Sequence, residues 1–237
     1  ALNVASGKEE YTFTNSSAQG GNDQAIGIIT GLAVNYATNR LYFTSRAASG
    51  GSSNTVWCLS VNATSATLLW ARALGDIDTA PLLFNGRLYV GTNGGVAYAL
   101  DPAASGSTVW SYATSNGPIK GYLYPHGGTN PLKLYFSTTD KIWGIQENGT
   151  ATPTKLWEVT TVPSPSTPLV LPTTNYLLAG GGDGRISQFD VTDPAATTVW
   201  RQLGTGTIGS PGLDNLNQIV IVGSSGGTVY ALTVLLS

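Results

Sequence analysis

A short β-rich segment recurs five times along this 237-residue chain, at intervals of 42–47 residues. Each copy is a run of apolar and aromatic residues that ends in small residues, as strands commonly do. The copies begin at Leu41, Leu88, Leu134, Leu177 and Ile219. A period of this length indicates units that must stack on their neighbours to bury their apolar faces. We therefore expect residues 1–237 to form a single domain.

Three further sequence marks keep the same period. A tryptophan preceded by an apolar residue occurs at Trp70, Trp110, Trp157 and Trp200. A second alternating run separates the first segment from its tryptophan, and its copies begin at Val56, Ala97, Ile142, Ile186 and Val229. Another apolar run precedes the first segment, most clearly at residues 80–84 and 168–171. Each period therefore holds four short strands, with Gly, Asn and Asp clusters supplying hairpin turns.

Four antiparallel strands in a repeat of this length are typical of a β-propeller blade. We place the blades at residues 26–73, 74–113, 114–160, 161–203 and 204–237. Because no segment with helical periodicity and a capping signature interrupts them, alternating βα folds are excluded. The sequence thus predicts an all-β, five-bladed β-propeller of four-stranded antiparallel blades.

The last blade lacks a tryptophan-bearing outer strand and would leave a strand edge unpaired. Residues 8–14, near the N-terminus, have the character of such a strand, and Tyr11 stands where the repeat places tryptophan. We therefore expect this N-terminal strand to pair with residues 204–237 and to close the ring.

The stretch from Leu88 to Trp110 resembles the repeat of quinoprotein-like β-propellers, the PQQ-repeat type. Poorer copies extend the resemblance over most of the chain from about residue 26 onward. The resemblance implies that the outer-strand tryptophan of each blade docks against the neighbouring blade, a role that falls to Trp70, Trp110, Trp157 and Trp200. The family includes quinone-dependent dehydrogenases, outer-membrane assembly lipoproteins and pilus-associated surface proteins, so the fold does not decide the function.

Departures from the dehydrogenase pattern favour the non-enzymatic branch of this family. Quinone-dependent dehydrogenases resemble eight-bladed rings with two adjacent cysteines over the cofactor, whereas this chain has about five repeats and a single cysteine. That residue, Cys58, occupies the register of Ala99, Gly144 and Ala231, which indicates a small buried side chain. We expect neither an enzyme nor a bound quinone.

Composition excludes other classes of partner. Charged residues make up 10% of the chain and the net charge is −2, which provides no basic field for nucleic acid. No apolar run approaches the roughly 20 residues of a membrane helix, so direct membrane insertion is not expected. Abundant Ser and Thr, with candidate glycosylation triplets at Asn15, Asn62 and Asn148, favour an extracellular, cell-surface or periplasmic location.

Asp76 and Asp78 form the best candidate metal site, because two carboxylates at alternate positions can share a hard cation such as Ca²⁺. Calcium needs six to eight oxygen ligands, and the full Asp-x-Asp-x-Asp-Gly pattern is absent, so we expect no cofactor and keep Ca²⁺ as the alternative. A glycosidase would need two carboxylates flanking one bond. Asp140 and Asp183 are the other acidic residues that could join Asp76 and Asp78 there.

The connections that enter the blades and the turns beside them are expected to gather on one axial face. The candidate residues of this binding face are Asp76, Asp78, Asn93, Lys120, Asp140 and Asp183. Their unequal surroundings favour one asymmetric site over five identical ones. The sequence thus favours an extracellular or envelope-associated propeller that serves as a protein-interaction or structural module, as part of a larger surface assembly or filament. The alternative is a carbohydrate-binding or glycan-processing propeller.

Overall fold

The structure is a computed structural model that describes residue 2 and residues 5–13, 26–127, 131–171, 174–194 and 199–233. Within these ranges the chain is all β, with nineteen strands and no helix. None of the described residues forms a helix long and apolar enough to span a bilayer. The strands make five antiparallel sheets in chain order, four of four strands and a last one of three.

The sheets are numbered 1 to 5 along the chain, and each lies within one of the predicted blades. Sheet 1 contains β1 (Ile29–Asn35), β2 (Arg40–Ser45), β3 (Val56–Val61) and β4 (Ala66–Arg72). Sheet 2 contains β5 (Leu82–Phe84), β6 (Arg87–Gly91), β7 (Val96–Asp101) and β8 (Ser107–Ala113). Sheet 3 contains β9 (Lys120–His126), β10 (Lys133–Ser137), β11 (Ile142–Asn148) and β12 (Ala151–Val159).

The two remaining sheets complete the fold. Sheet 4 contains β13 (Leu169–Val170), β14 (Tyr176–Gly180), β15 (Arg185–Asp190) and β16 (Val199–Gln202). Sheet 5 contains β17 (Gly212–Asp214), β18 (Ile219–Gly223) and β19 (Val229–Thr233). In every sheet each strand pairs with the next strand of the chain, as expected of propeller blades.

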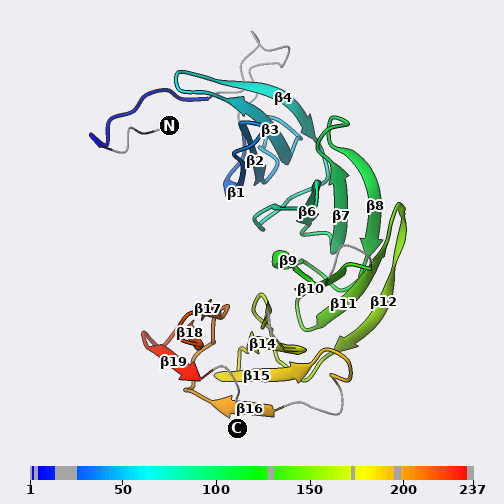
Figure 1. Cartoon of the computed structure of the whole chain (residues 1–237), viewed down its shortest axis with the longest axis vertical. Helices are drawn as coiled ribbons and strands as arrows, with labels where there is room; N and C mark the ends of the chain where they lie inside the picture. Colours follow the sequence, from blue (N-terminus) through cyan, green and yellow to red (C-terminus); the bar gives the residue numbers. More distant parts are fainter. Residues whose placement is uncertain are drawn as a thin grey trace.

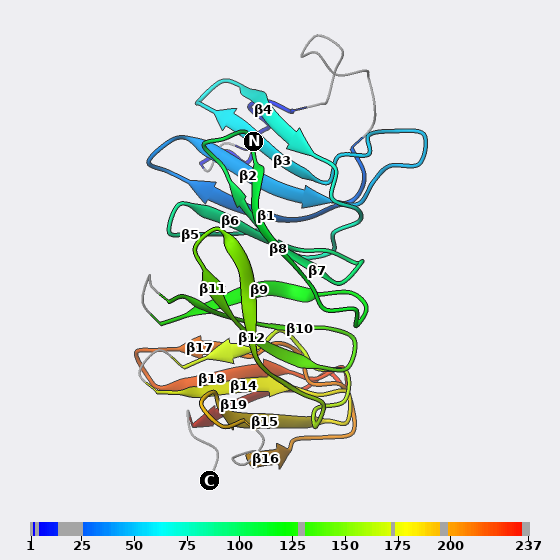
Figure 2. The same cartoon turned by 90° about the vertical axis from the view of Figure 1, so that its right-hand side faces the viewer.

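The sheets follow one another around an arc (Figure 1), with the first strand of sheet 1 on the inside and β4, β8, β12 and β16 on the outside. From the side (Figure 2), sheets 1 to 4 succeed one another in chain order along the long axis, and sheet 5 lies level with sheet 4. The arc is open between sheets 1 and 5 (Figure 1), so the predicted five sheets are present but the ring is not closed.

Apolar side chains pack between each pair of neighbouring sheets. Between sheets 1 and 2, for example, Tyr42, Cys58 and Trp70 pack on Leu88 and Val90. Comparable clusters lie between sheets 2 and 3, 3 and 4, and 4 and 5. Burial of each large apolar side chain contributes about 1.5–3 kcal/mol, so these interfaces are the main source of stability.

Three outer-strand tryptophans connect their own sheet to the next one. The indole nitrogen of Trp70 donates to the Pro102 carbonyl at 3.3 Å, and that of Trp157 donates to the Val191 carbonyl at 2.8 Å. The Trp110 indole donates instead to the Glu147 carboxylate, at 2.8 Å. Each contact joins the outer strand of one sheet to the end of the third strand in the following sheet.

A small residue opposite the indole makes this docking sterically feasible. In register, Trp70 lies opposite Cys58, Trp110 opposite Ala99 and Trp157 opposite Gly144. A Cβ atom on Gly144 would lie only 2.6 Å from the Trp157 ring. Burial raises the pKa of the Cys58 thiol to about 11, consistent with its expected place in the core.

The predicted pairing of residues 8–14 with the last sheet is not confirmed. The described residues of this segment, 8–13, lie beside sheet 1: the Tyr11 hydroxyl donates to the Asn62 carbonyl at 2.9 Å, and Phe13 packs on the cluster around Phe43 and Trp57. Tyr11 therefore does not take a tryptophan's place on sheet 5. The free apolar face of sheet 1 gives Phe13 a surface to cover, which explains why the segment lies there.

Candidate functional site

The connections between sheets are hydrogen-bonded to the sheet that they leave. Three of them carry a buried isoleucine whose amide donates to the residue at or just after the end of the second strand. Ile77 donates to the Ser45 carbonyl at 3.3 Å, Ile119 to Thr92 at 3.1 Å and Ile208 to Gly181 at 3.0 Å. A backbone amide buried away from water needs such a partner.

The same connections also bond to the sheet that they enter. The amide of Asn93 donates to the Asp76 carbonyl at 2.8 Å, and the amide of Ser225 donates to Thr207 at 2.9 Å. The connections between sheets, together with the turns between the second and third strands of each sheet, therefore form one continuous surface, which we call the connection face. It comprises residues 46–55, 73–81, 92–95, 114–119, 138–141, 160–168, 181–184, 203–211 and 224–228. The remaining hairpins form the opposite face.

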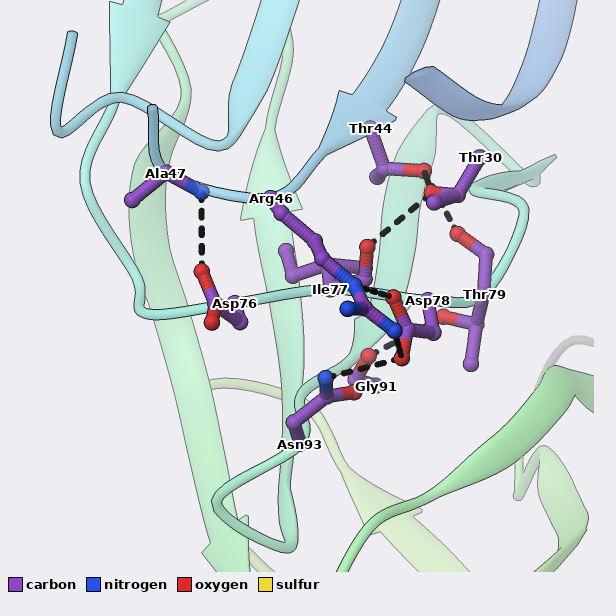
Figure 3. A network of polar contacts seen from close by, with 10 residues as sticks. All are labelled: Thr30, Thr44, Arg46, Ala47, Asp76, Ile77, Asp78, Thr79, Gly91 and Asn93. Carbon is purple, nitrogen blue, oxygen red and sulfur yellow. Dashed lines mark hydrogen bonds and ion pairs between the residues drawn. The ribbon is translucent and has the colours of Figure 1, made fainter. Parts of the chain in front are cut away.

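Two acidic residues of the first connection are held by different partners (Figure 3). The Arg46 guanidinium binds the Asp78 carboxylate through two contacts, at 2.5 and 2.7 Å, and Asn93 donates to the same carboxylate at 3.0 Å. The Asp76 carboxylate accepts the Ala47 amide at 2.8 Å. The hydrogen bonds from Arg46 hold the pKa of Asp78 below its usual range.

Threonine hydroxyls also fix the backbone of this connection (Figure 3). Thr30 donates to the Ile77 carbonyl at 3.0 Å, and Thr44 donates to the Thr79 carbonyl at 2.5 Å. The Thr79 hydroxyl in turn donates to the Gly91 carbonyl at 3.0 Å. The polar side chains of the connection thus rest on a backbone that is bonded to both sheet 1 and sheet 2.

This geometry can be compared with the two alternatives that the sequence left open for Asp76 and Asp78, a calcium site and a glycosidase site. Both carboxylates of the candidate calcium site already have protein partners, and the described residues contain no group of three or more His, Cys, Asp or Glu that could hold a metal ion. A glycosidase acid needs a raised pKa, whereas that of Asp78 is lowered. The arrangement of Asp76 and Asp78 is that of a fixed polar surface.

The second and third connections meet at Lys120. Its ammonium group donates to the Thr139 carbonyl at 3.1 Å and to the Ser164 hydroxyl at 3.0 Å, so it bridges a turn of sheet 3 to the connection that enters sheet 4. Burial lowers the pKa of Lys120, while the nearby Asp140 carboxylate acts in the opposite direction. Lys120 and Asp140 therefore lie together on the connection face.

Asp183 lies farther along the same face and pairs with Arg185, whose Nε is 3.6 Å from the carboxylate. The six residues predicted for the binding face thus all border the connection face, but the structure brings them together as separate groups. Asp76, Asp78 and Asn93 form one group, and Lys120 lies with Asp140. Arg46 was missed because its partner Asp78 lies 32 residues away in another turn, whereas Arg185 stands two residues after Asp183, a spacing that could have signalled the pair.

Trp200 is the exception among the outer-strand tryptophans, and its predicted docking role is wrong in this structure. Trp200 pairs with Ser187 of the third strand. In sheets 1 to 3 the tryptophan pairs with the position that is Cys58, Ala99 or Gly144, and the residue at that position in sheet 4 is Gln188, one residue farther along. A shift of one residue turns a side chain to the other face of its sheet. Trp200 is accordingly 51% exposed, and its ring is stacked on the Arg185 guanidinium, 3.9 Å from the ring centroid.

A sequence signal for this shift exists in the third strand. Four sheets have an aromatic residue followed by a small one: Trp57-Cys58, Tyr98-Ala99, Trp143-Gly144 and Tyr230-Ala231. Sheet 4 reverses the sizes with Ser187-Gln188. Because Gln188 fills the space that an indole would need, and Ser187 leaves space on the other face, the outer strand pairs one residue out of step.

The candidate glycosylation residues lie outside the connection face. Asn62 and Asn148 are exposed in hairpins of the opposite face, where their side chains bond to Ser65 and Thr154. Asn15 lies outside the described residues. Glycosylation at all three stays a prediction.

The comparisons with known proteins agree with this architecture. A structure of BamB from Moraxella catarrhalis matches with a TM-score of 0.62 and 22% identity, over 88% of this chain and 62% of that chain. A protein from Lactobacillus plantarum matches with a TM-score of 0.66 and 14% identity, over 88% of this chain and 71% of that one. This chain thus spans less than two thirds of the Moraxella protein, and both likenesses concern the fold.

No curated protein matches the chain. The family model described as "Outer membrane protein assembly factor BamB" matches residues 1–130, which is more than half of the sequence. This match agrees with the PQQ-type repeat identified in residues 88–110. The chain therefore belongs to the family of outer membrane protein assembly factor BamB, a family of PQQ-repeat β-propellers.

Proposed function

We propose that the chain is a protein-interaction module of the cell envelope that holds a protein partner on its connection face during outer membrane protein assembly. The observation that carries the proposal is the double anchoring of the connections, each bonded through backbone or side-chain groups to the sheets that it joins. A surface that is ordered before binding loses less conformational entropy when a partner docks. The family description supplies the biological setting.

The polar side chains of the connection face suit a partner with mixed charge. Arg46, Lys120 and Arg185 alternate with Asp78, Asp140 and Asp183, so neither sign dominates the surface. Paired charges of this kind set register and specificity more than affinity. We propose neither a catalytic step nor a bound metal, and we place the module in the periplasm or at the outer membrane.

Site-specific photo-crosslinking tests which face the partner uses. A crosslinking amino acid is placed at Asp140 or Ser210, both exposed on the connection face, and as matched controls at Ala103 or Thr150, both exposed on the opposite face. The chain is then expressed with the outer-membrane assembly machinery of its own organism. We expect a discrete crosslinked protein from the first pair alone. Crosslinks from the control positions alone, or none from any position, would contradict the proposal.

A further inference from the structure

A hollow of about 310 Å³ lies beside Trp200, lined by Thr161, Arg185, Ser187 and Trp200. Its size falls at the lower end of pockets that hold small ligands, about 300–1,000 Å³. Ser187 stands at the register where the other sheets carry a large aromatic side chain, so the space arises from this substitution and from the shifted outer strand. The hollow therefore follows from the local sequence of sheet 4.

The walls of the hollow combine an aromatic ring with groups that both donate and accept hydrogen bonds. One face of the Trp200 indole is covered by the Arg185 guanidinium. The hydroxyls of Thr161 and Ser187 can each donate one hydrogen bond and accept others. Arg185 lines the hollow, and its Nε donates to Gln202 Oε1 at 3.1 Å, which orients the planar guanidinium; its terminal amino groups are further donors.

The charge balance of the hollow selects a neutral ligand. The Asp183 carboxylate, whose nearer oxygen is 3.6 Å from Arg185 Nε, already offsets the guanidinium charge. An anionic ligand would have to compete with that carboxylate, and a cationic ligand would be repelled by Arg185. A neutral ring with an apolar face and a hydroxyl rim meets the indole and the hydrogen-bonding groups together.

We propose that this hollow binds one ring of a neutral saccharide, stacked on Trp200 and hydrogen-bonded by Arg185, Ser187 and Thr161. The site lies at the edge of the connection face, which contributes Thr161, but its binding of a sugar does not require a protein partner. Stacking would remove the apolar face of the exposed Trp200 ring from water, while the hydroxyl groups at the rim of the sugar stay hydrogen-bonded. The protein would thereby have a glycan site at the edge of its proposed protein-docking surface.

The test is binding of the full chain to a printed array of neutral oligosaccharides, followed by titration of each bound sugar in solution. We expect saturable binding of at least one sugar, and Trp200→Ala should weaken it about tenfold or more, since stacking and lost area together exceed about 1.4 kcal/mol. Tyr36→Ala is the matched control: Tyr36 is 87% exposed in a hairpin of the opposite face, and its loss should leave binding unchanged.

A second variant separates loss of the site from loss of the fold. Ser187→Tyr restores the aromatic residue of the other sheets and should fill the hollow, abolishing sugar binding without lowering the melting temperature. Circular dichroism melts of all three variants check that they remain folded. The proposal is overturned if no neutral sugar on the array binds, or if binding survives both Trp200→Ala and Ser187→Tyr. A crosslinking failure on the connection face would leave this result untouched.

Discussion

At the scale of single residues, the polar pairs of the connection face join positions that are distant in sequence. Arg46 lies 32 residues before Asp78, and Lys120 lies 44 residues before Ser164. The repeat predicted that the acidic residues would share a face, because strand order fixes where connections and turns lie. It could not predict their partners, since those depend on the path of each loop. This is why Asp76 and Asp78 resembled a cation site in the sequence.

The ion pair between Arg46 and Asp78 predicts a specific pH dependence. Because the pKa of Asp78 is lowered in the folded protein, its stabilising effect is present above the unfolded value of about 3.9 and is lost as the pH falls through the folded value. The side chains are 49% and 38% exposed, so solvent screening keeps the contribution of the pair to stability small at neutral pH.

A double-mutant cycle with Arg46→Ala and Asp78→Asn measures this pair. Urea unfolding at pH 7 should give a favourable coupling free energy between the two positions, and the coupling should fall toward zero below about pH 4 as the carboxylate is protonated. Zero coupling at pH 7, or a coupling that does not change with pH, would show that the ion pair is not formed in solution.

At the scale of strands and sheets, sequence periodicity predicted most of the structure. The recurring segment, the alternating run and the tryptophan run became the second, third and fourth strands, and the apolar run before them became the first, because each carries apolar residues that two neighbouring sheets must bury. The exception is β16, whose Trp200 is displaced because Gln188 replaces a small residue in the neighbouring strand β15. The sequence located the tryptophan correctly but did not predict which face of the sheet its side chain lies on, since that depends on the pairing register. The N-terminal segment was misplaced for a related reason: apolar character predicts burial but does not specify the sheet.

The difference between docked and undocked tryptophans can be measured. Trp110 is 3% exposed and donates to Glu147, so Trp110→Ala should lower the free energy of unfolding by about 3–5 kcal/mol. Trp200→Ala should change it by about 0.5 kcal/mol, as expected of an exposed site. Urea unfolding of the two variants beside the parent chain provides the comparison. Equal losses would mean that Trp200 is docked in solution.

At the scale of the whole molecule, the described residues form an arc of sheets whose two end sheets keep exposed apolar side chains. Leu32 on sheet 1 and Val229 on sheet 5 are 60% and 73% exposed, although their strands are apolar. The middle of the arc is different, because each sheet there is packed on both sides and the connections bridge its neighbours. The connection face therefore belongs to the folded unit as a whole, and its amides should not open independently of the sheets.

Native-state hydrogen exchange of the Ile77, Ile119 and Ile208 amides tests this claim most directly. These amides lie in connections without regular strand structure, where exposed loops normally exchange fast. If the connection face is anchored to the sheets, they should exchange as slowly as the central strands and accelerate with urea in parallel with them. Fast exchange that is insensitive to urea would contradict the account, because the proposed docking surface would then be unordered before a partner binds.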